Sequence, residues 1–281
     1  MTRLATAAGQ RAAGLGIDGV GFSAYNNAYL LWAVPHGIVT VSLVTALMPR
    51  MSGAAAEGDG AAVRRDVSYA LRTSAVAVVP AACALLALAQ PLMAVVFQYG
   101  RTGADDIAAM AGILTAFAPG LIAFSGQYAL SRAFYALRDT RTPLLLNLLI
   151  AGLNAGLSTA AYLLLPARWA VTGMAGAYSL ALFAGWALTA YTLHRRLPAG
   201  RTAGRSPALA AHARLLAAAL PAAALGHLAA GWAAGAGAVA ARAAGAAAIV
   251  AVFAVLAKPL RLTEVDALLS GAVRRLRPAK R

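Results

Sequence analysis

Charged residues are scarce in this chain. Only 12% of its 281 residues are Asp, Glu, Lys or Arg, whereas 61% are hydrophobic and the mean hydropathy is +0.70. A soluble domain usually carries about 25% charged residues. The composition therefore excludes an ordinary soluble protein and predicts an all-α, polytopic bundle of transmembrane helices.

The chain also lacks the residue clusters that metal sites and catalysis need. Its single cysteine, Cys83, lies in an apolar run, which excludes an internal disulfide and a cysteine metal site. The four histidines are far apart, and the nine acidic residues fall in predicted loops or tails. We therefore expect no metal, no cofactor and no enzymatic activity.

Nucleotide and nucleic-acid binding are not expected either. Gly14, Gly16 and Gly19 match G-x-G-x-x-G, but no predicted strand precedes them, and a G-x-x-x-x-G-K-S/T loop is absent from the sequence. The net charge of +15 would favour nucleic acid if the basic residues shared one face. They are instead spaced between long apolar runs, which is typical of membrane topology.

Apolar segments of membrane length are what the chain has in abundance. A helix of about 20 apolar residues crosses the ~30 Å hydrocarbon core of a bilayer. The last two predicted segments are mostly alanine and glycine, which are weakly hydrophobic. The seven predicted spans are 22–48, 67–97, 107–136, 143–165, 169–193, 213–233 and 236–257.

The charges between these spans predict their orientation. Alternate loops, together with the C-terminal tail, hold 19 of the 24 basic residues. Cytoplasmic loops retain Lys and Arg, so this set is predicted to be cytoplasmic, with the C-terminus inside and Met1 outside.

Polar side chains within the spans are candidates for a cavity, because exposing them to lipid is costly. Bonding between helices is the alternative. Spacings of seven and four residues place Asn147, Asn154 and Ser158 along one face of a helix, and Asn154 with Ser158 is a possible cation site. The substrate-cavity candidates are Asn26, Asn27, His36 and Asn147.

Prolines within the predicted spans favour bent helices, because each removes a backbone hydrogen bond. Five prolines among the seven predicted spans favour a transporter with moving parts. The G-x-x-x-G spacing of Gly152 and Gly156 favours close approach of two helix backbones. The five prolines are Pro35, Pro80, Pro91, Pro119 and Pro221.

The tail 258–281 has apolar residues at helical spacing followed by Arg274, Arg275 and Arg277. This pattern predicts a short amphipathic helix that binds anionic lipids of the inner leaflet. A solvated basic tail is the alternative.

Three stretches resemble the MurJ (MviN) family: TALMPRMSGAAAEGD from Thr45, FQYGR from Phe97 and RAFYALRDTRTP from Arg132. Members of that family move lipid II, the peptidoglycan precursor, across the bacterial inner membrane. The resemblance covers about residues 20–196. The family-motif positions are Pro35, Pro49, Arg50, Gly100, Phe134, Tyr135, Asp139, Thr140 and Pro143.

The resemblance implies a fold of fourteen helices, of which this chain would supply the eighth onward, with an N-terminal half missing. It also implies alternating access around a basic cavity that holds the head of an undecaprenyl-linked precursor. The family often has an arginine where this chain has Leu30. Some relatives have a sodium site at the places of Asn154 and Ser158.

We therefore predict translocation of lipid II across the bacterial cytoplasmic membrane, as part of a longer or two-part protein. Export of another polyprenyl-linked glycan or a drug is one alternative, and a non-transporting membrane interaction protein is another. The predicted parts are an exported segment 1–21, a five-helix flippase lobe 22–196, a cytoplasmic basic loop 197–212, two peripheral transmembrane helices 213–257 and a basic amphipathic cytoplasmic tail 258–281.

Overall fold

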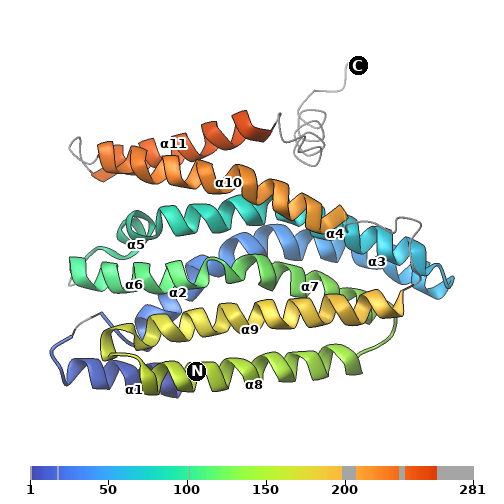
Figure 1. Cartoon of the computed structure of the whole chain (residues 1–281), viewed down its shortest axis with the longest axis horizontal. Coiled ribbons are helices and arrows are strands. Elements are labelled where there is room, and N and C mark those ends of the chain that lie inside the picture. Colours follow the sequence, from blue (N-terminus) through green and yellow to red (C-terminus); the bar gives the residue numbers. More distant parts are fainter. Residues whose placement is uncertain (1, 18, 101, 198–206, 234–237, 258–281) are drawn as a thin grey trace.

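A computed structural model describes residues 2–17, 19–100, 102–197, 207–233 and 238–257, and within these ranges it contains helices and their connections but no strand. The predicted amphipathic tail 258–281 lies outside the described residues. The helices lie side by side along one long axis (Figure 1). In chain order they are α1 (Thr2–Ala13), α2 (Phe22–Pro35), the π-helix η1 (His36–Val41), α3 (Ser42–Ala56), α4 (Gly60–Ala87), α5 (Ala89–Phe97), α6 (Ala104–Phe117), α7 (Gly120–Ala136), α8 (Arg141–Leu164), α9 (Ala167–Arg196), α10 (Pro207–Trp232) and α11 (Ala238–Ala257).

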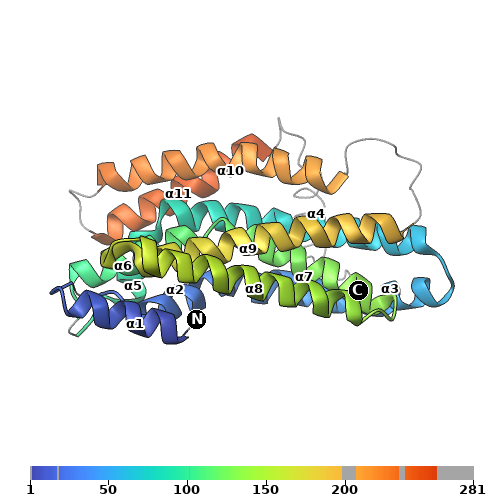
Figure 2. The same cartoon turned by 60° about the horizontal axis from the view of Figure 1, so that its bottom comes forward.

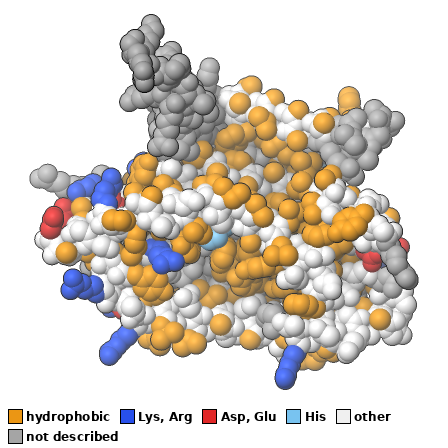
Figure 3. Space-filling view, turned by 180° about the vertical axis from the view of Figure 1, so that it is seen from behind, with side chains coloured by type: hydrophobic (Ala, Val, Ile, Leu, Met, Phe, Trp, Pro, Cys, Tyr) orange, Lys and Arg blue, Asp and Glu red, His pale blue; other side chains and the backbone are white. Residues whose placement is uncertain are grey.

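The connections between helices lie at two ends of the bundle. We call one the basic end; it holds the α3–α4 turn, the α7–α8 turn and the C-terminus of α9. The opposite end holds the α1–α2, α5–α6 and α8–α9 connections (Figure 1). Figure 3 shows hydrophobic side chains over the middle of one face and charged side chains mainly toward the two ends. This is the surface that a bilayer requires.

Six predicted spans are confirmed as helical segments of membrane length. The first is the continuous run α2–η1–α3, and α4, α8, α9 and α10 are single helices that are long and apolar enough to cross a membrane. The sixth is the pair α6 and α7, which is bent by 45°. The last predicted span is represented by α11, whose described apolar stretch, Ala243–Leu256, is shorter.

At the opposite end, the structure differs from the predicted spans in two ways. Helix α1 was not predicted, because its sequence is short and mostly alanine and polar residues, yet its alanines at positions 5, 8 and 12 are buried. Arg11 Nη1 on this helix donates to the carbonyl oxygen of Tyr162 at 2.9 Å. The span predicted at 67–97 is divided at Leu88 into α4 and α5.

Helices α10 and α11 pack together on one side of the bundle, whereas α1 and α8 lie on the other (Figures 1 and 2). Helices α4, α7 and α9 contribute the most buried residues to the interior between them. Its largest fully buried side chains include Trp32, Phe117 and Phe134. Helix α10 begins at Pro207, six residues before the predicted start of that span.

Candidate functional site

The four cavity candidates do not converge on one point within the described residues. Asn26 is exposed on α2, and Asn147 is exposed on α8. Asn27 is partly buried, and its Nδ2 lies 3.8 Å from the sulfur of Met110 on α6. Asn26 shares the outward face of α2 with Leu30, Val34 and other apolar side chains, so this face is largely hydrophobic.

His36 is buried where α2 passes into the π-helix. Its Nδ1 lies 3.0 Å from the hydroxyl of Ser125 on α7. The ring also contacts Phe124 and Tyr128, with centroid distances of 4.3 and 5.2 Å. His36 therefore joins η1 to α7 through ring contacts and through one of its two ring nitrogens, Nδ1.

Asn154 and Ser158 are brought together on the buried face of α8, but Asn147 does not share that face. Ser158 Oγ donates to Asn154 Oδ1 at 3.2 Å, and both side chains are buried. The buried positions of α8 step by four residues from Leu146, so the packing seam winds by about 40° per step and leaves Asn147 outside.

The pair supplies two neutral oxygens to a possible cation. Tight cation sites usually include carboxylates. Within the part of the chain that the structure describes, no group of three or more His, Cys, Asp or Glu residues is arranged to hold a metal ion. The cation site of Asn154 and Ser158 therefore stays a prediction.

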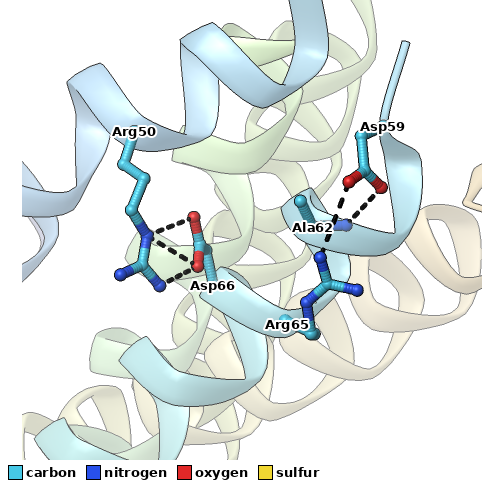
Figure 4. A network of polar contacts seen from close by, with 5 residues as sticks. All are labelled: Arg50, Asp59, Ala62, Arg65 and Asp66. Atoms are coloured by element: carbon cyan, nitrogen blue, oxygen red, sulfur yellow. Dashed lines mark hydrogen bonds and ion pairs between the residues drawn. The ribbon is translucent and has the colours of Figure 1, made fainter. Parts of the chain in front are cut away.

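The first family motif forms an ionic contact at the basic end (Figure 4). Arg50 Nε donates to the two carboxylate oxygens of Asp66 at 2.9 and 2.8 Å, and its Nη2 forms an ion pair with the same group. The Asp66 side chain is only 5% exposed, whereas that of Arg50 is 65% exposed. Pro49, the residue before Arg50, is exposed within α3. Sequence analysis missed Asp66, because its distance in sequence gives no sign of the pairing.

The same turn is strengthened by Asp59, the N-cap residue of α4. Its side chain accepts the backbone N–H of Ala62 at 2.8 Å and lies 3.5 Å from Arg65 Nη2 (Figure 4). On the next turn of α4, Arg64 donates to the carbonyl oxygen of Leu197 at 2.6 Å, which ties α4 to the end of α9.

The third family motif ends α7 and begins α8. The backbone N–H groups of Asp139 and Arg138 donate to the carbonyls of Phe134 and Tyr135 at 2.9 and 3.0 Å, a Schellman pattern. Arg138 has a φ of 59°, a left-handed conformation that usually favours glycine. Phe134 is fully buried, so the motif fixes the end of α7 against the core.

Asp139 then holds the start of α8, just before the helix N-cap residue Thr140. Its carboxylate accepts the hydroxyl of Thr142 at 2.6 Å and the backbone N–H groups of Thr142 and Arg141, each at 3.0 Å. Arg196 from α9 completes an ion pair. The hydrogen bonds from Thr142, with Arg196, hold the pKa of Asp139 below its ordinary value. Pro143 is the third residue of α8, where no N–H is needed.

At two helix breaks that contain a proline, a side chain from another helix bonds a backbone carbonyl. Pro91 cannot supply the N–H that would bond the carbonyl of Ala87, and His227 Nδ1 on α10 lies 3.0 Å from that oxygen. At the α6–α7 break beside Pro119, Ser179 Oγ on α9 donates to the carbonyl of Ala116 at 2.8 Å. The prolines indicated both breaks, but no local pattern indicates which distant side chains act as donors.

A cavity of about 670 Å³ lies between α5, α6 and α10, near the opposite end. Alanine and glycine form much of its wall, with Gln90, Gln98, Thr115 and His227 as polar lining residues. The predicted cavity residues are not among its lining residues. Gly100 lies in the nearby α5–α6 connection with a φ of 63°, which explains a glycine at that motif position.

Comparison with known proteins agrees with this arrangement. A solved structure titled "Lipid II flippase MurJ, inward closed conformation" superposes on 85% of this chain and 47% of its own length, with a TM-score of 0.63 and 18% identity. At this identity the likeness concerns the fold. The fold class predicted from the sequence is therefore confirmed.

Curated relatives match shorter stretches. The "Probable lipid II flippase MurJ" of Rhizobium meliloti (strain 1021) is 28% identical over 156 residues, which is 56% of this chain and 28% of that protein. The "Probable lipid II flippase MurJ" of Buchnera aphidicola subsp. Acyrthosiphon pisum (strain APS) is 32% identical over 120 residues, 43% of this chain and 24% of that protein. The chain thus spans well under two thirds of the relatives it matches.

The most extensive match is to a family. The model described as "Lipid II flippase MurJ" matches residues 2–242, which include α1 and the breaks at Leu88 and Pro119. The chain therefore belongs to the lipid II flippase MurJ family.

Proposed function

We propose that this chain forms a helical lobe of a flippase that moves lipid II across the bacterial cytoplasmic membrane. The observation that carries this proposal is the family match over residues 2–242, supported by the shared fold. Since the matched relatives are longer than the matched region, activity is proposed for the chain together with a further helical lobe rather than for the chain alone.

The exposed apolar face of α2 and η1 supports a role beside another part of a transporter. Leu30, Val34 and Ile38 are 56%, 49% and 68% exposed, and Asn26 lies on the same face. We infer that this face borders the path of the substrate, with Asn26 as its polar group. Alternating access would then move this lobe against its counterpart.

The distribution of charge supports an orientation. The basic end holds the α3–α4 turn, the α7–α8 turn and the C-terminus of α9, which are rich in arginine. Positive loops favour the cytoplasm, so the basic end and the C-terminus are proposed to be cytoplasmic. The tail 258–281 is proposed to bind anionic lipids of the inner leaflet.

The test is replacement of the cell's own flippase. The chain is expressed alone, or together with the N-terminal half of a full-length relative, while the native lipid II flippase is depleted. We expect restored growth and lipid II export only when both parts are present. Failure of the pair, with both parts correctly inserted, would contradict the proposal and favour a non-transporting interaction protein.

Identification of bound lipid separates lipid II from other cargo. The assembled pair is purified in mild detergent and its bound lipids are analysed by native mass spectrometry. Lipid II is expected to be retained. Retention of another polyprenyl-linked glycan, without lipid II, would place the chain with an exporter of different specificity.

A further inference from the structure

Arg132, like Arg195, contacts a tyrosine and differs from the arginines of the basic end that pair with a carboxylate. Arg50, Arg65 and Arg196 each pair with a carboxylate, and Arg64 bonds to carbonyls at the end of α9. Within the described part of the chain, Arg132 has no ion pair. Its charge is therefore not neutralised by a neighbouring residue.

Two tyrosines hold the guanidinium of Arg132 in place. It lies 4.8 Å from the ring centroid of Tyr128 and 5.6 Å from that of Tyr135, and its Nη2 donates to the Tyr128 hydroxyl at 3.0 Å. Aromatic faces attract a cation without cancelling its charge. A guanidinium has five N–H donors. One bond to Tyr128 leaves most of them available to a ligand.

The position of this side chain suits a charged ligand at the membrane boundary. Arg132 is partly exposed and lies four residues before the end of α7, at the basic end. A charged side chain in a membrane helix normally faces a cavity or a partner, because exposure to lipid is costly. The surrounding turns contain more arginines than carboxylates, which raises the local concentration of anions.

The geometry points to Arg132, held between Tyr128 and Tyr135, as a binding site for a phosphate group at the basic end. Its planar fork of donors matches two phosphate oxygens, a bidentate contact that an ammonium group does not make. The phosphate would come either from the pyrophosphate of a lipid-linked precursor or from an anionic phospholipid headgroup. The first source rests on the proposed function, whereas the second does not.

Tyr128 also connects this site to the interior of the bundle. Its ring meets the ring of His36 edge-on at 5.2 Å, and His36 marks the start of the π-helix. A ligand that displaces Arg132 from Tyr128 would therefore act on the contact between α7 and η1. This places the phosphate site beside an irregular part of the fold.

Binding of inorganic pyrophosphate to the complete 281-residue chain tests the site. The chain is placed in nanodiscs of phosphatidylcholine alone, and Kd is measured by isothermal titration calorimetry. Arg132→Gln is expected to raise Kd about tenfold, because a charge-assisted bidentate contact is lost. Arg195→Gln is the matched control, since Arg195 also stacks on a tyrosine four residues earlier, Tyr191, and both of these α9 side chains are exposed. It is expected to change Kd less than twofold.

Two further arms identify the source and guard against misfolding. If phospholipid headgroups occupy the site, nanodiscs containing phosphatidylglycerol should weaken pyrophosphate binding to the wild type but not to Arg132→Gln. If phosphatidylglycerol does not compete with pyrophosphate, the site is assigned to the lipid-linked precursor. If Arg132→Gln does not fold, Arg132→Lys keeps the charge, loses the fork and is expected to raise Kd about threefold.

An unchanged Kd in the folded Arg132 variants, or an equal loss in Arg195→Gln, would overturn the inference. Wild-type binding too weak to detect in both nanodisc types would also overturn it. The growth test of the proposed function is independent. A chain that fails to support lipid II export but binds pyrophosphate through Arg132 would keep the site and lose the proposed function.

Discussion

The basic end and the two helix breaks are held by different kinds of polar contact. At the basic end, arginines pair with carboxylates, as Arg50 does with Asp66 and Arg196 with Asp139. At the α6–α7 break, by contrast, the neutral hydroxyl of Ser179 satisfies the backbone carbonyl of Ala116. Water can replace a lost partner at an exposed end, whereas a carbonyl in the membrane interior has no such substitute. We therefore expect the neutral contacts to matter more for stability.

The largest loss of stability is expected from a substitution at the α6–α7 break, where an added side chain would push α9 away from the start of α7. A Cβ added at Gly120 would lie 2.5 Å from Ser179 Oγ and 3.0 Å from Ser179 Cα. Gly120→Val should lower the free energy of unfolding by about 3 kcal/mol through overpacking. Unfolding by SDS titration measures it. Gly152→Val is the control, because no atom lies within 4 Å of a Cβ there; an equal loss in both variants would contradict the close packing at Ser179.

Removal of the Ser179 hydroxyl alone should lower the free energy of unfolding by somewhat less. Ser179→Ala leaves the carbonyl of Ala116 without its partner, at a cost of about 2 kcal/mol. The same SDS titration applies. In Thr192→Val the lost hydroxyl bonds only to Leu188 on its own helix, at 2.8 Å, so a change below about 0.5 kcal/mol is expected. A loss in Ser179→Ala no greater than in this control would show that the break does not depend on α9.

Loss of an ionic contact at the basic end should lower the free energy of unfolding by a still smaller amount. Asp139→Asn removes the charge that interacts with Arg196 and with the start of α8, and should cost about 1 kcal/mol near neutral pH. Because folding lowers the pKa of Asp139, its stabilising effect is present above the ordinary aspartate pKa and disappears as pH falls through the lower folded value.

Thermal stability in detergent between pH 3 and pH 7 measures this dependence. The wild type should be more stable than Asp139→Asn at pH 5 to 7, and the difference should shrink below about pH 4. Glu57→Gln, on an exposed residue of the same end, controls for general acid effects. A difference that stays constant down to pH 3 would contradict the lowered pKa of Asp139.

The smallest expected effect has the opposite sign. Arg138 holds a left-handed conformation at the end of α7, with a φ of 59°. Arg138→Gly should raise the free energy of unfolding by about 0.5 kcal/mol, since glycine adopts this conformation without strain. Arg141→Gly, at the first residue of α8, should instead be neutral or destabilising. A loss of stability in Arg138→Gly would mean that its side chain contributes more than the strain costs.

The positions of the membrane helices could be predicted well from the sequence, because apolar length is a local property. The prediction at 143–165 corresponds to α8, and that at 169–193 to α9. The breaks within helices are harder to predict from the sequence. Pro119 and Pro91 indicated bends, but the donors that bond carbonyls at these breaks lie on other helices, where no local pattern indicates them. Pro80, by contrast, lies inside an undivided α4.

The polar site residues show the same limit. The spacing of Asn154 and Ser158 placed them together correctly, since both lie on one helix within one turn. The prediction that Asn147 shares this face assumes that the buried positions follow a straight line along the helix. The close approaches at Gly120 and Gly185 lack the G-x-x-x-G spacing, while Gly152 and Gly156, which have it, meet nothing within 4 Å. Contacts between distant helices carry no one-dimensional signal.

The π-helix from His36 to Val41 has a consequence for comparing relatives. A single residue inserted into an α-helix rotates everything beyond it by about 100°, and a π-turn is the usual trace of such an insertion. In this chain α3, which follows the π-helix directly, presents Arg50 to Asp66. A relative that lacks one residue in this stretch, and forms a regular helix instead, would need a different partner for its buried aspartate even with every motif letter in place.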